Sequence, residues 1–192
     1  MPTDEMLEPQ KEKRKGLIKA KKADRAMDNM FRIAMNNHLQ LSAMADAKAN
    51  MMITVCALIM TLSLVRIDSP TLQPAILSMG LTCVATILLA VYATMPKLPP
   101  RIAGEINARS PEFNLIFFGH FTQLDFQTYL REMEQVVNSR AVVYESLAKD
   151  LYALGKVLSD RKYRYIRISY QVFMIGLVIS MIVMAISLST RQ

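Results

Sequence analysis

The stretch ISYQVFMIGLVISMIVMAISL, residues 168–188, decides the fold, because it is apolar and long enough to cross a membrane as one helix. Two other stretches share its character: ANMMITVCALIMTLSLV at residues 49–65 and AILSMGLTCVATILLAVYATM at residues 75–95. None of the three contains Asp, Glu, Lys, Arg or His. About 20 apolar residues span the roughly 30 Å hydrocarbon core of a bilayer. The sequence therefore predicts three transmembrane helices and excludes an ordinary soluble domain.

The remaining chain is too short for a large catalytic domain. Of 192 residues, the parts expected in water are residues 1–48 and 97–167. They contain no nucleophile–base pair, no glycine-rich phosphate loop, no HExxH motif and no paired carboxylates. Cys56 and Cys83 both lie inside predicted spans and have no zinc spacing. We therefore expect a protein that is not an enzyme and that needs no metal and no cofactor.

The distribution of basic residues predicts the topology. Lys and Arg concentrate in residues 1–48 and 97–167, whereas the loop between the first two spans has only Arg66. Basic segments stay on the cytoplasmic side. We expect the N-terminus and the large loop in the cytoplasm and the C-terminus outside it. The net charge of +7 favours contact with anionic membrane lipids rather than nucleic acid, for which there is no recognition motif.

The predicted fold class is all-α, a three-span transmembrane helical bundle with a long helical cytoplasmic stalk. A new helix is expected to begin at Thr122, with Asp125 completing an approximate capping box. The helical pattern that starts at Arg140 shows no break before Ile168, so the segment from Arg140 to Leu188 is predicted to be one helix. The expected segments are a disordered basic tail 1–18, a cytoplasmic helix 19–48, spans 49–67, 75–95 and 168–188, and a cytoplasmic helical region 97–167.

The first candidate site is at the cytoplasmic end of the first span. Asp46, Lys48 and Asn50 lie there, and a carboxylate gains nothing from anionic lipid. We predict that Asp46 forms an ion pair with the basic cluster before the third span. In the favoured interpretation this ion pair has a structural role. In the alternative it takes part in ligand sensing or gating. That basic cluster comprises Arg161, Lys162, Arg164 and Arg167.

The second candidate is the apolar loop Asn114–Phe121. In the favoured interpretation this loop packs under the stalk or lies on the membrane surface. In the alternative it forms a pocket wall, where aromatic rings stack on a base and polar groups bind its edge. The residues of this alternative are Asn114, Phe117, Phe118, His120 and Phe121.

The third candidate is the segment Asp150–Leu158 and the basic residues after it. Gly155 costs about 1 kcal/mol in a helix relative to alanine, which a close helix contact would justify. Lys156, Lys162 and Arg164 could face an anionic phosphate, although helix packing and the positive-inside charge pattern are the simpler interpretation.

The fourth candidate lies within the spans. Small residues recur at four-residue steps, a pattern that lets helices approach closely. Helix packing is favoured over a weakly polar face that lines a pore after assembly. The residues are Ser78, Thr82, Thr86, Ala90 and Thr94 on the second span, and Gly176 and Ser180 on the third.

These segments together resemble a known family, the transmembrane effectors of the Pycsar antiphage system. The matching pieces are LSAMADAKAN at residues 41–50, NLIFFGHF at 114–121, and DLYALG at 150–155 with Lys162-Tyr163-Arg164. They occur in the family's order, with a hydrophobic hairpin after the first and a final span after the third. The resemblance covers about residues 35–188.

The resemblance implies a function. A partner pyrimidine nucleotide cyclase would make cyclic CMP or cyclic UMP on phage infection, and the effector would then impair the inner membrane and cause abortive infection. It implies a multi-pass inner-membrane protein, for which the distribution of Lys and Arg predicts a periplasmic C-terminus. We also expect a homo-oligomer. The alternative is a non-enzymatic membrane anchor or scaffold that docks a cytoplasmic protein.

Overall fold

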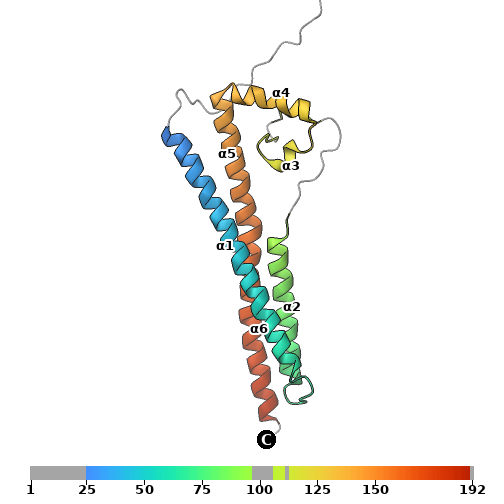
Figure 1. The fold of residues 1–192 in the computed structure, drawn as a ribbon. Helices are drawn as coiled ribbons and strands as arrows, with labels where there is room; N and C mark the ends of the chain where they lie inside the picture. Colours follow the sequence, from blue (N-terminus) through green and yellow to red (C-terminus); the bar gives the residue numbers. More distant parts are fainter. Residues whose placement is uncertain (1–24, 97–105, 111–112, 191–192) are drawn as a thin grey trace, which may run out of the picture. The chain divides into compact units, whose positions relative to one another are not determined.

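The computed structural model describes residues 25–96, 106–110 and 113–190. The described chain is helical without strands, and three of its helices are long and apolar enough to cross a membrane, which confirms the predicted fold class. The expected tail 1–18, the first residues of the helix expected over 19–48 and the segment 97–105 lie outside the described residues. The helices are α1 (Arg25–Leu64), α2 (Gln73–Thr94), α3 (Phe118–Phe121), α4 (Phe126–Val137), α5 (Arg140–Val157), a π-helical turn η1 (Leu158–Tyr163) and α6 (Arg164–Ser189) (Figure 1).

The chain divides into two units. One, the bundle unit, comprises residues 33–97 and 153–192. The other, the loop unit, comprises residues 1–32 and 98–152. The bundle unit contains all three predicted spans, and the loop unit contains the aromatic loop of residues 113–121.

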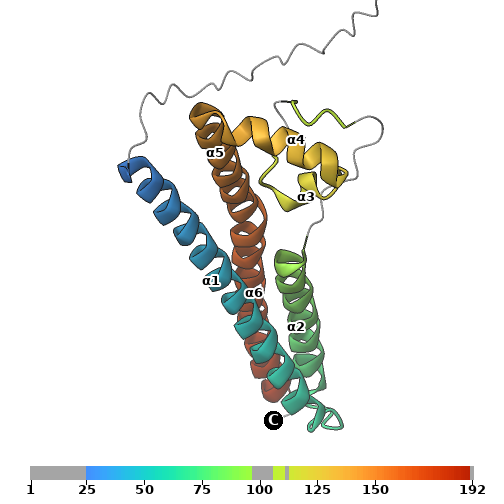
Figure 2. The same ribbon diagram turned by 45° about the horizontal axis from the view of Figure 1, so that its top comes forward.

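In the bundle unit, α1, α2 and α6 lie side by side (Figures 1 and 2). Small side chains form one core between them, because alanine lets neighbouring backbones approach closely. This core comprises Ala45, Ala49, Ala90, Ala93 and Ile166. A second core comprises Cys56, Met79 and Cys83. The outward faces carry exposed Leu, Ile, Val and Met side chains, as expected of helices that face lipid.

The ends of the spanning helices follow from local sequence. Helix α1 ends at Leu64, before the predicted limit at residue 67, and hydrogen-bonded turns carry the chain into α2. Pro74 sits in the first turn of α2, where its missing N–H costs nothing. The helix ends before Pro96, which cannot continue it.

In the loop unit, a small core packs the aromatic loop against α4 and α5. Its buried members are Ala108, Phe113, Leu115, Val136 and Val142. Arg109 contacts the carboxylate of the buried Glu132 at 3.2 Å, which fixes the segment before the loop to α4. The Tyr144 hydroxyl donates to Asp28 at 2.7 Å, and its ring stacks on Phe31 at 5.9 Å.

Two local expectations need correction. Helix α4 begins at Phe126 rather than Thr122, because the Asp125 side chain accepts from the Thr128 N–H and is itself the N-cap. The Thr122 hydroxyl instead donates to the Phe118 carbonyl within the preceding turn. The segment from Arg140 is one helical run to Ser189, but the six residues of η1 interrupt its α-helical geometry.

Candidate functional site

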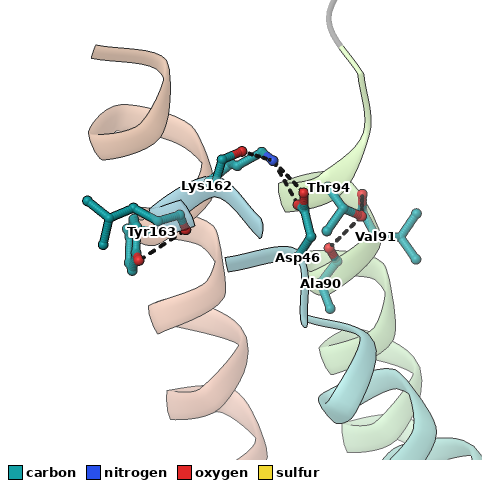
Figure 3. A network of polar contacts seen from close by, with 8 residues as sticks. Asp46, Ala90, Val91, Thr94, Lys162 and Tyr163 are labelled. Carbon is teal, nitrogen blue, oxygen red and sulfur yellow. Dashed lines mark hydrogen bonds and ion pairs between the residues drawn. The ribbon is translucent and has the colours of Figure 1, made fainter. Parts of the chain in front are cut away.

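An ion pair joins α1 to η1 in the bundle unit. The Lys162 ammonium lies 2.7 and 2.8 Å from the two Asp46 carboxylate oxygens and 2.8 Å from the Ser42 hydroxyl (Figure 3). Ser42 and Asp46 share one face of α1, because residues four apart are neighbours on a helix. We call these three residues the polar network. The predicted ion pair of Asp46 is therefore present, and Lys162 is its partner.

The π-helical turn explains how this part of the chain reaches two other helices. A π turn contains an extra residue and so re-aims the side chains that follow. Three consecutive residues of this turn contact α1 or α2. The Arg161 guanidinium lies 5.2 Å from the centre of the Tyr92 ring of α2, Lys162 pairs with Asp46, and the Tyr163 hydroxyl donates to the Leu41 carbonyl of α1 at 3.2 Å.

The polar network is partly shielded from water. The Lys162 side chain is 19% exposed and the Asp46 side chain 42% exposed. On either side of Asp46, Ala45 and Ala49 are fully buried against α2 and α6. The Asp46 carboxylate therefore lies where the contact between the helices begins, with one side exposed to water.

The other residues predicted near this site point elsewhere. Lys48 and Asn50 on α1 are exposed, as are Lys156 on α5 and Arg164 on α6. None of these four takes part in the polar network. Gly155 does have the close contact that would justify it, because a Cβ there would lie 3.0 Å from the His38 ring.

In the loop unit, Asn114 organises the aromatic loop. Its backbone N–H donates to His120 Nδ1 at 3.0 Å, and its side-chain oxygen accepts from the Ile116 N–H at 3.0 Å. Its amide also donates to Asp150 at 3.4 Å. Burial lowers the pKa of His120 and raises the pKa of Asp150. Since Nδ1 accepts a hydrogen bond, the geometry requires neutral His120.

Most aromatic rings of this loop contact protein. Phe113 stacks on His120 at 5.2 Å, and Phe117 meets the same ring edge-on at 5.1 Å. Phe121 lies 5.3 Å from Tyr129. Phe118, which is 54% exposed, keeps the largest free surface for stacking on a ligand. The structure thus brings Asn114, Phe117, Phe118 and His120 together.

The small residues of the spans meet between α2 and α6. The Ser78 hydroxyl donates to the Ser180 hydroxyl at 3.0 Å. Gly176 faces Thr82 so closely that a Cβ would overlap the threonine side chain. Thr86 and Ala90 are fully buried, and Thr94 is half-buried with its hydroxyl bonded to its own helix. We call this the small-residue interface: Ser78, Thr82, Thr86, Ala90, Gly176 and Ser180.

Sequence reasoning missed two features. The π-helical geometry of η1 has no signal in the letters LSDRKY, because wide and regular helical turns use the same residue types. The ion pair between Arg109 and buried Glu132 was also missed. Among the residues that the structure describes, no three His, Cys, Asp or Glu side chains are placed to share a metal ion.

The chain matches a known protein family. A family model described as the Pycsar effector protein domain matches residues 29–189. The match includes the polar network, the aromatic loop and all three apolar helices. Searches of curated proteins and of solved structures gave no significant match.

Proposed function

The chain belongs to the Pycsar effector family, and from this membership we propose that a cyclic pyrimidine nucleotide activates it to impair the inner membrane. The coarse role follows from the family: the protein is a membrane-embedded antiphage defence effector. The finer steps form the proposal. Cyclic CMP or cyclic UMP comes from a partner cyclase, the effector makes the membrane leaky, and the infected cell dies.

The proposed orientation places the end of the bundle that carries Asp46 in the cytoplasm. The Lys and Arg counts of the loops support this orientation, with a periplasmic C-terminus and a cytoplasmic large loop. A nucleotide made in the cytoplasm would then reach the polar network and the aromatic loop. Family membership also favours an effector without enzymatic activity, acting on lipid with no cofactor.

The observation that carries the mechanism is the ion pair between Asp46 and Lys162 at the π-helical turn. A cyclic nucleotide has one phosphate anion, and a phosphate is a ligand that Lys binds well. We place this phosphate at Lys162, in competition with the Asp46 carboxylate. A ligand shifts a conformational equilibrium only by its differential affinity, and this competition supplies one.

The π-helical turn offers a way to transmit that event. If η1 converts to regular α-helix, the helix loses one residue of register, which rotates its two sides relative to each other by about 100°. Lys162 would then no longer face Asp46. The contact between α1 and α6 at this end would loosen, and the spans could assemble with other copies. Within the loop unit, Phe118 offers a separate stacking surface for a base, shaped by Asn114, Phe117 and His120.

Dye leakage from liposomes that contain the purified protein tests this function. Cyclic CMP, cyclic UMP, cyclic AMP and cyclic GMP are added separately, and circular dichroism confirms that the inserted protein is helical. We expect leakage with one pyrimidine nucleotide and none with the purine nucleotides. No leakage with any of the four would contradict the proposal and favour the anchor that docks a cytoplasmic protein.

A further inference from the structure

A second feature of the bundle unit lies at its other end, near the turn that joins α1 to α2. It is an apolar groove with a volume of about 410 Å³, a size typical of ligand sites. Side chains from all three long helices line it, including Ile59 and Leu62 of α1, Met79 of α2, and Leu177 and Met184 of α6. Its lining is almost entirely apolar, so its occupant must present hydrocarbon.

One cation borders this groove. Arg66 follows the end of α1, and its backbone N–H is bonded to the Ser63 carbonyl at 3.1 Å. The residue is exposed, and it forms no ion pair with a carboxylate of the described chain. A guanidinium has the planar donor geometry that suits a phosphate. The groove therefore combines an apolar channel with an anion-binding group at its edge.

The length of the groove matches part of one lipid leaflet. The α1 side runs from Ile59 to Arg66 and the α6 side from Leu177 to Met184, about 10 Å at the rise of an α-helix. Half of a roughly 30 Å hydrocarbon core is about 15 Å. Arg66 stands where the apolar stretch of α1 ends, which is the level of lipid headgroups. A partner helix would fill the apolar part but would leave the guanidinium without an anion.

We propose that this groove binds one anionic phospholipid, with an acyl chain along α1, α2 and α6 and the phosphate at Arg66. The site is separate from the nucleotide mechanism proposed above and needs no ligand-induced change. The bound lipid anchors the turn between α1 and α2 in the surrounding membrane.

Native mass spectrometry of the detergent-purified full chain tests this site, with phosphatidylglycerol and phosphatidylcholine of equal chain length as probes and no nucleotide present. We expect the protein to retain phosphatidylglycerol, and Arg66→Gln to reduce its retention about tenfold, because one charge-assisted contact is lost. Arg167→Gln is the matched control: it removes an exposed charge outside the groove and should leave retention unchanged. Leu177→Trp, which fills the groove, should reduce retention with Arg66 intact.

Three results would overturn the proposal. One is equal retention of phosphatidylglycerol by the wild type and Arg66→Gln. Another is equal retention of the two lipids by the wild type. The third is a dimer without lipid that Leu177→Trp separates, which would assign the groove to a second copy. All three readouts use the resting protein, so they stand apart from nucleotide-dependent leakage.

Discussion

The small-residue interface and the polar network hold the same bundle by different means. In the interface between α2 and α6, Gly176 lies so close to Thr82 that a Cβ would overlap it, and Thr86 and Ala90 are fully buried. In the polar network, one partly exposed ion pair joins α1 to a π-helical turn. Close packing is intolerant of rearrangement, whereas an ion pair with an open side can exchange its partner.

This difference assigns the two regions different roles. The interface has its polar groups satisfied within the bundle, with the Thr82 and Thr86 hydroxyls bonded to carbonyls of their own helix. The network lies at an irregular turn, and irregular turns inside helices are common at functional sites. We infer that the interface keeps α2 and α6 together in both states, and that the network is the part that changes.

The largest expected effect comes from adding a side chain at Gly176. In Gly176→Val, the new atoms would overlap Thr82, and overpacking of this kind costs about 3 kcal/mol or more. We expect loss of the folded bundle and of toxicity, measured by thermal unfolding in detergent and by growth of expressing cells. Gly80→Val is the matched control, because a Cβ at Gly80 meets nothing within 4 Å. Equal unfolding temperatures for the two variants would refute the role of the interface.

An intermediate effect is expected at the ion pair. Asp46→Asn and Lys162→Met should each raise leakage in the absence of nucleotide, because either change removes the contact that holds the resting state. A double-mutant cycle on unfolding should give a coupling of about 1 kcal/mol, as for a partly exposed pair. Lys48→Met, an exposed neighbour on α1, serves as the control. Additive effects of the two variants would show that the pair does not act as a unit.

The smallest expected effect is a pH dependence of the aromatic loop. Because burial lowers the pKa of His120, the folded loop favours the neutral ring. Stability from this group is complete above the unfolded pKa of about 6.5 and is lost as the pH falls below it. Amide hydrogen exchange of residues 113–121 should therefore speed up between pH 7.5 and pH 5, after correction for intrinsic rates.

Asp150 works in the opposite direction, since burial raises its pKa and favours its protonated form in the folded state. Asp150→Asn removes this contribution and should enlarge the change in amide hydrogen exchange with pH that His120 causes. His120→Asn should abolish the pH dependence in the same segment. A dependence that persists in His120→Asn would assign it to another group.

The sequence predicted the features that rest on composition and on short-range periodicity. Three charge-free apolar stretches are sufficient to predict three spans, because the bilayer leaves a helix few alternatives. The need of Asp46 for a cation was also readable, since a carboxylate next to a span has no partner in lipid. Lys162 could not be selected from four nearby basic residues, because that choice depends on the π-helical turn.

The aromatic loop shows more clearly what the sequence could not predict. Its composition allowed either a packed loop or a stacking surface. Whether Phe113 or Phe118 is covered depends on contacts with α4 and α5, which are distant in sequence. The small-residue pattern indicated close helix contact, but the pairing of Gly176 with Thr82 and of Ser78 with Ser180 is visible only in the structure.

Spin-label distance measurement in liposomes tests the central claim most directly. One label pair reports on the network, at the exposed residues Ala47 and Val157, and a second reports on the interface, at the exposed Leu81 and Val178. Both are introduced as cysteines in a chain whose Cys56 and Cys83 are replaced by alanine and whose leakage response is intact. We predict that the activating pyrimidine nucleotide changes the first distance and leaves the second unchanged. A change in the second distance, or an unchanged first distance under conditions that cause leakage, would contradict the account.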